Sequence, residues 1–268
     1  METKRNYVID FDSTFTQVEA LDVLGEISLA NAKDKAAKLA ELKSLTDRGM
    51  EGKLAFRDSL RERLDILEAE EKHLEPLIEN LKTRISKSFR RNEEFFRENR
   101  DHIYIMSNGF KEFIIPIVAE LGIKAEHVFA NDFVFDENRK IVGFNTENVL
   151  SSNNGKVKQL QSLDLQGDVY VIGDGYTDYE IKAAGLANKF YAFTENVERD
   201  QVTEKADHIT PSFDEFLYLH KMNKAISYPK NRIKVLLLEN VHADAVKIMK
   251  EEGYNVQTIA GALDEEEL

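Results

Sequence analysis

The chain has 268 residues, of which 42% are hydrophobic, so it is long enough for one large folded domain or two smaller ones. Acidic residues outnumber basic residues by 49 to 36, the formal net charge is −13, and no cluster of Lys and Arg interleaves with aromatic residues, which argues against a nucleic-acid partner. The absence of cysteine excludes disulfides, thiolate metal sites and thiol catalysis. The first residues contain no apolar run long enough for a signal peptide or a membrane span, so we expect a cytoplasmic protein without a membrane partner.

Short apolar runs that end in polar or glycine-rich turns predict buried parallel strands. These runs are Tyr7–Asp10, His102–Ser107, Val169–Gly173 and Lys189–Phe193. Helical patterns follow at Lys111–Leu121, Val157–Leu163 and Asp178–Ala184. The alternation predicts an α/β fold with a doubly wound, mostly parallel sheet, and such sheets place their ligands at the carboxyl ends of the strands.

Two segments depart from this alternation. From Val18 to about Ser86 the spacing of apolar residues is helical and strand signals are nearly absent, which predicts a helical bundle inserted as a cap after the first strand. From His127 to Phe144, two alternating runs flank the turn "DENRK", which predicts a β-hairpin.

A polar stretch near Asn223–Lys230 predicts a linker before a short strand–helix–strand extension. We therefore expect a phosphatase-sized unit at 1–222, with a core of 1–16 and 87–222 and a cap of 17–86, followed by a linker at 223–230 and an extension at 231–268. The extension is too short to bury a core of its own.

Small, hydroxyl and acidic residues gather at the expected strand ends. The motifs are "DFDST" at Asp10–Thr14, "SNG" at Ser107–Gly109 and "GDGYTD" at Gly173–Asp178, with Lys156 at the start of a helix. Each motif is weak alone, and their order along the chain is informative. In a parallel sheet they would converge on one crevice.

This combination suits phosphoryl transfer. Aligned carboxylates bind Mg²⁺ through oxygen, which fits Asp10, Asp174 and a backbone carbonyl of the first motif. A carboxylate can attack phosphorus to form an aspartyl-phosphate if the approaching anions are neutralised, and a second acid can protonate the leaving oxygen. For Ser13 and Thr14 we expect only that their hydroxyls stabilise the turn that presents Asp12.

The ordered motifs and the helical insertion resemble the haloacid dehalogenase superfamily of phosphatases over roughly residues 1–222. By this resemblance Asp10 is the nucleophile, Asp12 is the acid/base, and Ser107 and Lys156 bind phosphate. The resemblance implies Mg²⁺ as cofactor, with a site made of Asp10, Asp12 and Asp174 and supported by Asp178.

The cap is similar to that of phosphoserine phosphatases, in Glu19 and in "MEGKLAFRDSLRERL" from Met50 to Leu64. This implies that Glu19 meets the substrate ammonium, that Arg63 pairs with its carboxylate and that Met50 and Phe56 close the apolar side. Three further residues are expected beside the substrate: Asn108, Gly109 and Thr177. Thr177 stands where that family more often has asparagine, and Asn108 where it often has glycine.

The last 37 or so residues resemble the opening strand–helix–strand of D-3-phosphoglycerate dehydrogenase, which acts two steps before phosphoserine hydrolysis. The resemblance implies fusion to, or association with, such a dehydrogenase. Because no G-x-G-x-x-G fingerprint is present, no dehydrogenase activity is expected.

These features predict a Mg²⁺-dependent phosphoserine phosphatase of serine biosynthesis, with a small phosphoamino acid as substrate. Another small-molecule phosphatase or a phosphotransferase is the alternative within the enzyme class. A phospho-aspartate receiver module is less consistent, because receivers lack both the second acid and the cap, and an inactive scaffold is disfavoured by intact Asp10, Asp12, Lys156 and Asp174. Homo-oligomerisation stays open.

Overall fold

The computed structural model describes residues 4–50, 54–225 and 230–263, without the side chains of residues 47, 49 and 50. The chain divides into two compact units, Met1–Thr210 and Pro211–Leu268. Each unit is described by itself.

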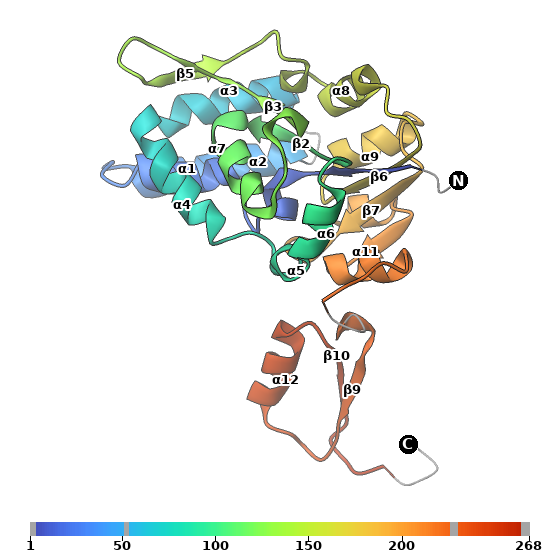
Figure 1. Cartoon of the computed structure of the whole chain (residues 1–268). Coiled ribbons are helices and arrows are strands. Elements are labelled where there is room, and N and C mark those ends of the chain that lie inside the picture. The colour runs from blue at the N-terminus through green and yellow to red at the C-terminus, as the bar shows by residue number, and fades with distance from the viewer. Residues whose placement is uncertain (1–3, 51–53, 226–229, 264–268) are drawn as a thin grey trace. The chain divides into compact units, whose positions relative to one another are not determined.

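A six-stranded parallel sheet forms the centre of the first unit (Figure 1). Its strands, in spatial order, are β3 (Val128–Asn131), β2 (Ile103–Phe110), β1 (Arg5–Ile9), β6 (Asp168–Gly173), β7 (Lys189–Phe193) and β8 (His208–Thr210). The predicted α/β fold and the four predicted strands are confirmed. The edge strand β8 escaped prediction because it is only three residues long and carries little periodicity, whereas β3 fell within the predicted hairpin.

Two predicted boundaries were wrong. Strand β2 continues beyond Ser107 to Phe110, and its pairing with β3 is irregular between Met106 and Phe110. The "SNG" motif therefore lies within the last residues of the strand and not after it. The predicted hairpin at 127–144 is smaller than expected, because its first residues form β3 of the main sheet. Only β4 (Phe133–Phe135) and β5 (Ile141–Phe144) pair antiparallel.

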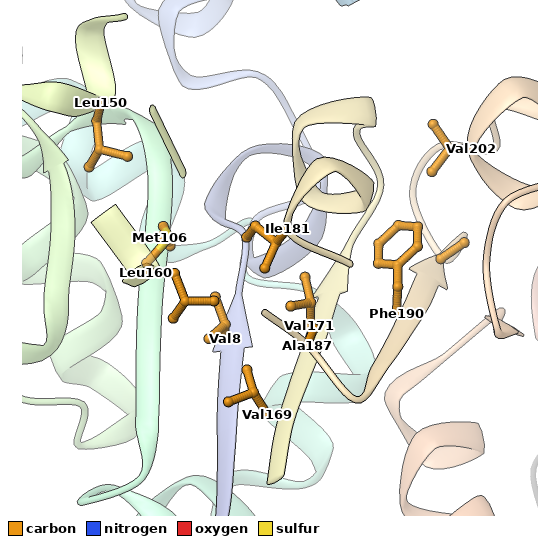
Figure 2. Packing of buried hydrophobic residues seen from close by; sticks show 11 residues of the cluster. Val8, Met106, Leu150, Leu160, Val169, Val171, Ile181, Ala187, Phe190 and Val202 are labelled. Atoms are coloured by element: carbon orange, nitrogen blue, oxygen red, sulfur yellow. The ribbon is translucent and has the colours of Figure 1, made fainter. Parts of the chain in front are cut away.

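Helices cover both faces of the sheet, as a doubly wound fold requires. On one face Leu160 and Ile181 pack against Val8, Met106 and strand β6 in one apolar cluster (Figure 2). These side chains come from α8 (Gly155–Leu163) and α9 (Tyr176–Ala183), and α10 (Asp200–Thr203) adds to the same cluster.

Aromatic rings cover the opposite face, because successive strand residues point to alternate sides. The Tyr7 ring meets Phe95 edge to face at 5.1 Å, and Phe193 lies 5.2 Å from Phe89. The helices that supply these rings are α5 (Lys87–Arg91) and α6 (Glu93–Asn99), and α7 (Lys111–Val118) follows β2.

The predicted cap is a group of four helices inserted between β1 and β2: α1 (Ala20–Ser28), α2 (Lys35–Met50), α3 (Phe56–Leu67) and α4 (Leu74–Lys82). Figure 1 shows them gathered at the end of the sheet where β1 stops. The chain leaves and re-enters the core side by side, since Thr16 and Ile85 form an isolated antiparallel bridge. Short single turns complete the unit: η1 (Phe11–Phe15), η2 (Glu71–His73), η3 (Ala119–Leu121), η4 (Ala125–His127) and η5 (Val149–Ser151).

The second unit contains α11 (Phe213–Leu219), the turn η6 (Lys230–Arg232), β9 (Lys234–Leu237), α12 (Ala243–Glu251) and β10 (Asn255–Thr258). Strands β9 and β10 pair in parallel, which confirms the predicted strand–helix–strand extension. Helix α12 has no fully buried residue. The extension therefore does not enclose a core of its own.

Candidate active site

Two neighbouring strands deliver aspartates to one edge of the sheet. Asp10 follows β1 directly and Asp174 follows β6, and these strands pair in register from Arg5↔Asp168 to Ile9↔Ile172. The Asp10 backbone N–H donates to the Ile172 carbonyl at 3.0 Å, which continues the ladder up to the first acid. Backbone pairing alone therefore places Asp10 and Asp174 side by side.

The turn after Asp10 folds back sharply, and this turn decides where Asp12 points. Ser13 adopts a left-handed backbone conformation with φ of 54°. The Asp10 carboxylate accepts the Phe11 backbone N–H at 2.7 Å, and the Asp12 carboxylate accepts the Ala20 backbone N–H, also at 2.7 Å. A backbone N–H therefore fixes the orientation of each of the two carboxylates, Asp10 and Asp12.

Ser13 and Thr14 do more than the local role expected from the sequence. The Ser13 hydroxyl donates to Glu19 Oε1 at 2.8 Å, and the Thr14 hydroxyl donates to Asp174 Oδ1 at 2.8 Å. Both expectations were therefore too narrow, because the partners lie 6 and 160 residues away along the chain.

Three carboxylates gather beside one buried lysine. Ligand atoms of Asp10, Asp174 and Asp178 all lie within 4.8 Å of one another. Lys156 Nζ lies 2.9 Å from Asp10 Oδ1 and 2.8 Å from Asp178 Oδ1, and its side chain is 2% exposed. The structure therefore brings together "DFDST", "GDGYTD" and Lys156, as the sequence predicted.

The charges in this cluster act strongly on one another. Burial by itself would lower the pKa of Lys156, but the facing Asp10 and Asp178 raise it above its ordinary value, so the lysine stays protonated. Burial, with repulsion from Asp10, raises the pKa of Asp178 to about 7 despite Lys156. Lys156 therefore offsets only part of the negative charge around Asp178.

A hard divalent cation fits this donor set. The gathered ligand atoms are all carboxylate oxygens, which Mg²⁺ prefers, and the raised pKa of Asp178 shows that added positive charge would be stabilising there. The Asp12 carboxylate is not part of this group of three, so a contribution from Asp12 to a metal would have to come from its backbone carbonyl.

The surroundings of Asp12 favour its protonated form. Burial, followed by the nearby charge of Glu19, raises the pKa of Asp12 well above its ordinary value. A carboxyl group whose pKa is raised in this way is suited to the role of a general acid.

The "SNG" motif lies close to Asp12. The Gly109 N–H donates to Ser107 Oγ at 2.9 Å, and a side chain at Gly109 would come 3.2 Å from both Ser107 Oγ and Asp12 Oδ2. Glycine is therefore the residue that permits this close approach. The Asn108 side chain donates to the Leu150 carbonyl at 3.1 Å, which ties the motif to the turn η5.

A cavity of about 420 Å³ joins these core residues to the cap. Nine of the predicted site residues line it: Asp10, Asp12, Phe56, Arg63, Ser107, Asn108, Lys156, Asp174 and Thr177. Glu19, Gly109 and Asp178 adjoin the wall through the contacts given above. The side chain of Met50 lies outside the described residues. The volume suits a small metabolite.

Helix α3 forms the roof of the cavity. Phe56, Ser59 and Arg63 follow one another at helical spacing and all line the wall. Arg63 is buried, its Nη2 lies 3.9 Å from Asp22 Oδ1, and its Nε has no hydrogen-bond partner among the described residues. Because buried polar groups are normally paired, this Nε is a vacant donor at the roof.

Sequence reasoning missed several residues of the site. Thr46 and Ser59 line the cavity from the cap, and Ser152 to Asn154 line it before Lys156. Arg199 pairs with the Asp174 carboxylate and lies 3.8 Å from Glu19. The only available signal for Arg199 was its place in the loop after β7, the one predicted strand end without a motif.

Comparison with known proteins identifies the class. The family of haloacid dehalogenase-like hydrolases matches residues 7–181, and the chain belongs to this family. Within it the chain is phosphoserine phosphatase-like. It is 30% identical over 212 residues to the chloroplastic phosphoserine phosphatase of Arabidopsis thaliana (78% of this chain, 69% of the relative) and 28% identical over 212 residues to that of Drosophila melanogaster (78% and 75%).

A solved structure agrees. A phosphoserine phosphohydrolase-like protein from Francisella tularensis superposes with a TM-score of 0.71 at 29% identity, covering 81% of this chain and 99% of its own.

No helix within the described residues is long and apolar enough to cross a membrane.

Proposed function

We propose that the protein is a Mg²⁺-dependent phosphoserine phosphatase that hydrolyses L-phosphoserine to L-serine and phosphate. The observation that carries the proposal is a single cavity with an aspartate–lysine cluster on its floor and the vacant Arg63 donor on its roof. The floor suits a phosphate ester, and the roof suits a carboxylate.

In the first step an Asp10 carboxylate oxygen attacks phosphorus, and the bond from phosphorus to the serine oxygen breaks. Asp12 gives its proton to that oxygen, so serine leaves as an alcohol and an aspartyl-phosphate remains. The raised pKa of Asp12 favours this role, because burial and the nearby charge of Glu19 stabilise the protonated carboxyl.

In the second step Asp12, now ionised, accepts a proton from water as the water attacks phosphorus. The Asp10–phosphorus bond breaks, which releases phosphate and restores both aspartates. Lys156 and the Ser107 hydroxyl hold phosphoryl oxygens during both steps, with the Gly109 N–H beside them. Bound Mg²⁺ held by Asp10, Asp174 and Asp178 would offset the charge of the phosphoryl group.

The roof selects the amino acid. The Arg63 guanidinium can form two parallel hydrogen bonds to a carboxylate, and Phe56 covers the apolar side of the substrate. Glu19 is assigned to the substrate ammonium. Burial raises the pKa of Glu19 even though Arg63 and Arg199 act to lower it, so a nearby ammonium would stabilise its charged form.

The test is phosphate release from a panel of esters, with and without Mg²⁺. We expect phosphoserine to exceed phosphothreonine, sugar phosphates and phosphoethanolamine, which lacks the carboxylate that Arg63 would bind. Equal rates on phosphoserine and phosphoethanolamine would sink the substrate assignment while leaving a phosphatase. Transfer of phosphate to an added alcohol, in preference to water, would favour the phosphotransferase alternative.

We further propose a place in serine biosynthesis, which follows from the proposed reaction, and a cytoplasmic location. The expected domain limits at 222 and 230, and the link of the extension to D-3-phosphoglycerate dehydrogenase, remain proposals. A pull-down with the purified chain against a phosphoglycerate dehydrogenase tests the association, and absence of binding would remove it.

A further inference from the structure

Arg57 stands next to Phe56 on the roof helix, but its side chain reaches the core. Its Nε donates to the Ser151 carbonyl at 3.1 Å, and its Nη2 donates to the Thr146 carbonyl and to Ser151 Oγ, both at 3.0 Å. A guanidinium group can make this set of bonds because its donors form a planar fork. Arg57 therefore joins α3 to the loop around η5.

That loop is itself held by polar contacts. Asn148 Oδ1 accepts the Leu150 N–H at 3.0 Å, and Asn148 Nδ2 donates to the Ala130 carbonyl at 2.8 Å. Ser151 Oγ also donates to the Asn148 carbonyl at 2.8 Å. These hydrogen bonds hold the loop in place, so the acceptors for Arg57 have fixed positions.

The same loop supports two parts of the phosphate site. The Leu150 carbonyl accepts the Asn108 side chain, which lies between Ser107 and Gly109. A side chain at Gly155 would come 2.6 Å from the Val149 carbonyl oxygen and 2.8 Å from Leu150 Cα. The first turn of α8, which carries Lys156, is therefore seated directly on η5.

These contacts make one connected path. It runs from α3 through Arg57 to residues 146–151, and from there to Asn108 and to the turn that bears Lys156. Arg63 lies on the same rigid helix as Arg57, so the contact that sets the position of α3 also sets the position of Arg63 over the phosphate site.

We infer that Arg57 is a positioning residue. It fixes the position of helix α3 relative to residues 146–151, the loop that supports the proposed phosphate site. The inference rests on the proposed function for the identity of the substrate. The binding of a substrate that contacts both the floor and the roof depends on the position of α3. The binding of an aryl phosphate that contacts only the floor does not. Arg57 is not among the residues that line the cavity, so we expect it to act without touching either substrate.

The experiment compares Arg57→Ala and Arg57→Lys with Arg61→Ala. Arg61 lies on the same helix, is 59% exposed, and its Nη1 lies 3.6 Å from Asp58 Oδ1. For Arg57→Ala we expect KM for phosphoserine to rise about tenfold, as for the loss of charge-assisted hydrogen bonds, with kcat/KM for p-nitrophenyl phosphate within about twofold of wild type. Arg57→Lys should recover only part of the loss, because one ammonium cannot span the three acceptors.

A double-mutant cycle with Ser151→Ala gives an independent reading. If Arg57 acts through this loop, the effects of Arg57→Ala and Ser151→Ala on KM should be less than additive. Hydrogen exchange of the peptide covering 56–67 should rise in Arg57→Ala and stay at the wild-type level in Arg61→Ala.

The proposal is overturned if Arg57→Ala matches Arg61→Ala in KM and exchange, or if both substrates lose activity equally. A wild-type enzyme without preference for phosphoserine would instead defeat the proposed function. The exchange comparison needs no substrate and would still decide the role of Arg57.

Discussion

The floor and the roof of the cavity are built in different ways. On the floor, Asp10 and Asp174 continue paired central strands, and Lys156 and Asp178 are each 2% exposed in contact with one another. The roof is a helix of an inserted cap. Its polar ties to the core include the Arg57 contacts and two main-chain bonds to the hairpin, Ile141 N–H to Ala69 O and Glu71 N–H to Arg139 O, both at 2.9 Å.

The difference separates two tasks. In the proposed reaction, the groups that meet the transferring phosphoryl gain from a rigid sheet, because preorganised charge does not have to rearrange. The groups that we propose to select the amino acid lie on an inserted element, and elements of this kind can open to admit substrate and release product. Loss of a floor residue should therefore affect every ester, and loss of a roof residue should affect phosphoserine above all.

The strongest test of the floor is Asp10→Asn. Removal of the nucleophile should lower kcat by at least about 10⁴-fold on phosphoserine and on p-nitrophenyl phosphate alike. Phosphate release measures the rate, and circular dichroism checks that the variant is folded. Residual activity within tenfold of wild type on either ester would remove Asp10 from the role of nucleophile.

Asp12→Asn should separate the two steps. An aryl leaving group needs no protonation, so Asp10 should still be phosphorylated, but water attack should slow by about 10²- to 10⁴-fold. Rapid mixing with p-nitrophenyl phosphate should then show a burst of nitrophenolate near one equivalent per site before slow turnover. Wild-type turnover on both esters would show that Asp12 is not the acid/base.

The roof is tested by Arg63→Ala. Loss of a charge-assisted pair to the substrate carboxylate should raise KM for phosphoserine by roughly 10- to 100-fold and leave p-nitrophenyl phosphate within about threefold. Arg61→Ala, on the exposed side of the same helix, is the matched control and should resemble wild type. Equal losses on both esters would place Arg63 in the fold and not in recognition.

The smallest expected effect concerns stability and pH. The pKa of Asp178 is raised to about 7 in the folded protein, so the stability linked to its proton is full below about pH 4 and is lost as the pH rises towards 7. In metal-free buffer, the free energy of unfolding of wild type relative to Asp178→Asn should fall by on the order of 2 kcal/mol between about pH 5 and about pH 8.

Added Mg²⁺ should reduce that fall, because a cation stabilises the ionised carboxylates. Chemical denaturation across this pH range, with and without Mg²⁺, measures both effects. Curves for the two proteins that stay parallel at all pH values would show that Asp178 does not titrate there.

Prediction from the sequence succeeded where the signal was local. The strands before Asp10 and Asp174 are continuous apolar runs, and the insertion has clear helical spacing, so both were visible without tertiary information. The edge strand β8 and the true extent of β2 were not, because three residues or a single bulge carry too little periodicity. The hairpin was found but overextended, since β3 shares its alternating pattern.

The site shows the same division. The motif order placed Asp10, Asp12, Lys156 and Asp174 at one crevice, because parallel strands end at the same edge of a sheet. Arg199 was missed, since an arginine in a charged loop looks like ordinary surface.

By itself the sequence determined the α/β class, the helical insertion and the acids and lysine that lie together at the strand ends. Only the tertiary structure decided what Ser13 and Thr14 bind, which donor of Arg63 is vacant and that Arg57 joins the cap to the phosphate loop. The Thr14 and Arg57 contacts link residues that are far apart in the chain, and the Ser13 contact depends on a sharp turn. They depend on how helices pack and turns close, which residue spacing along one chain does not encode.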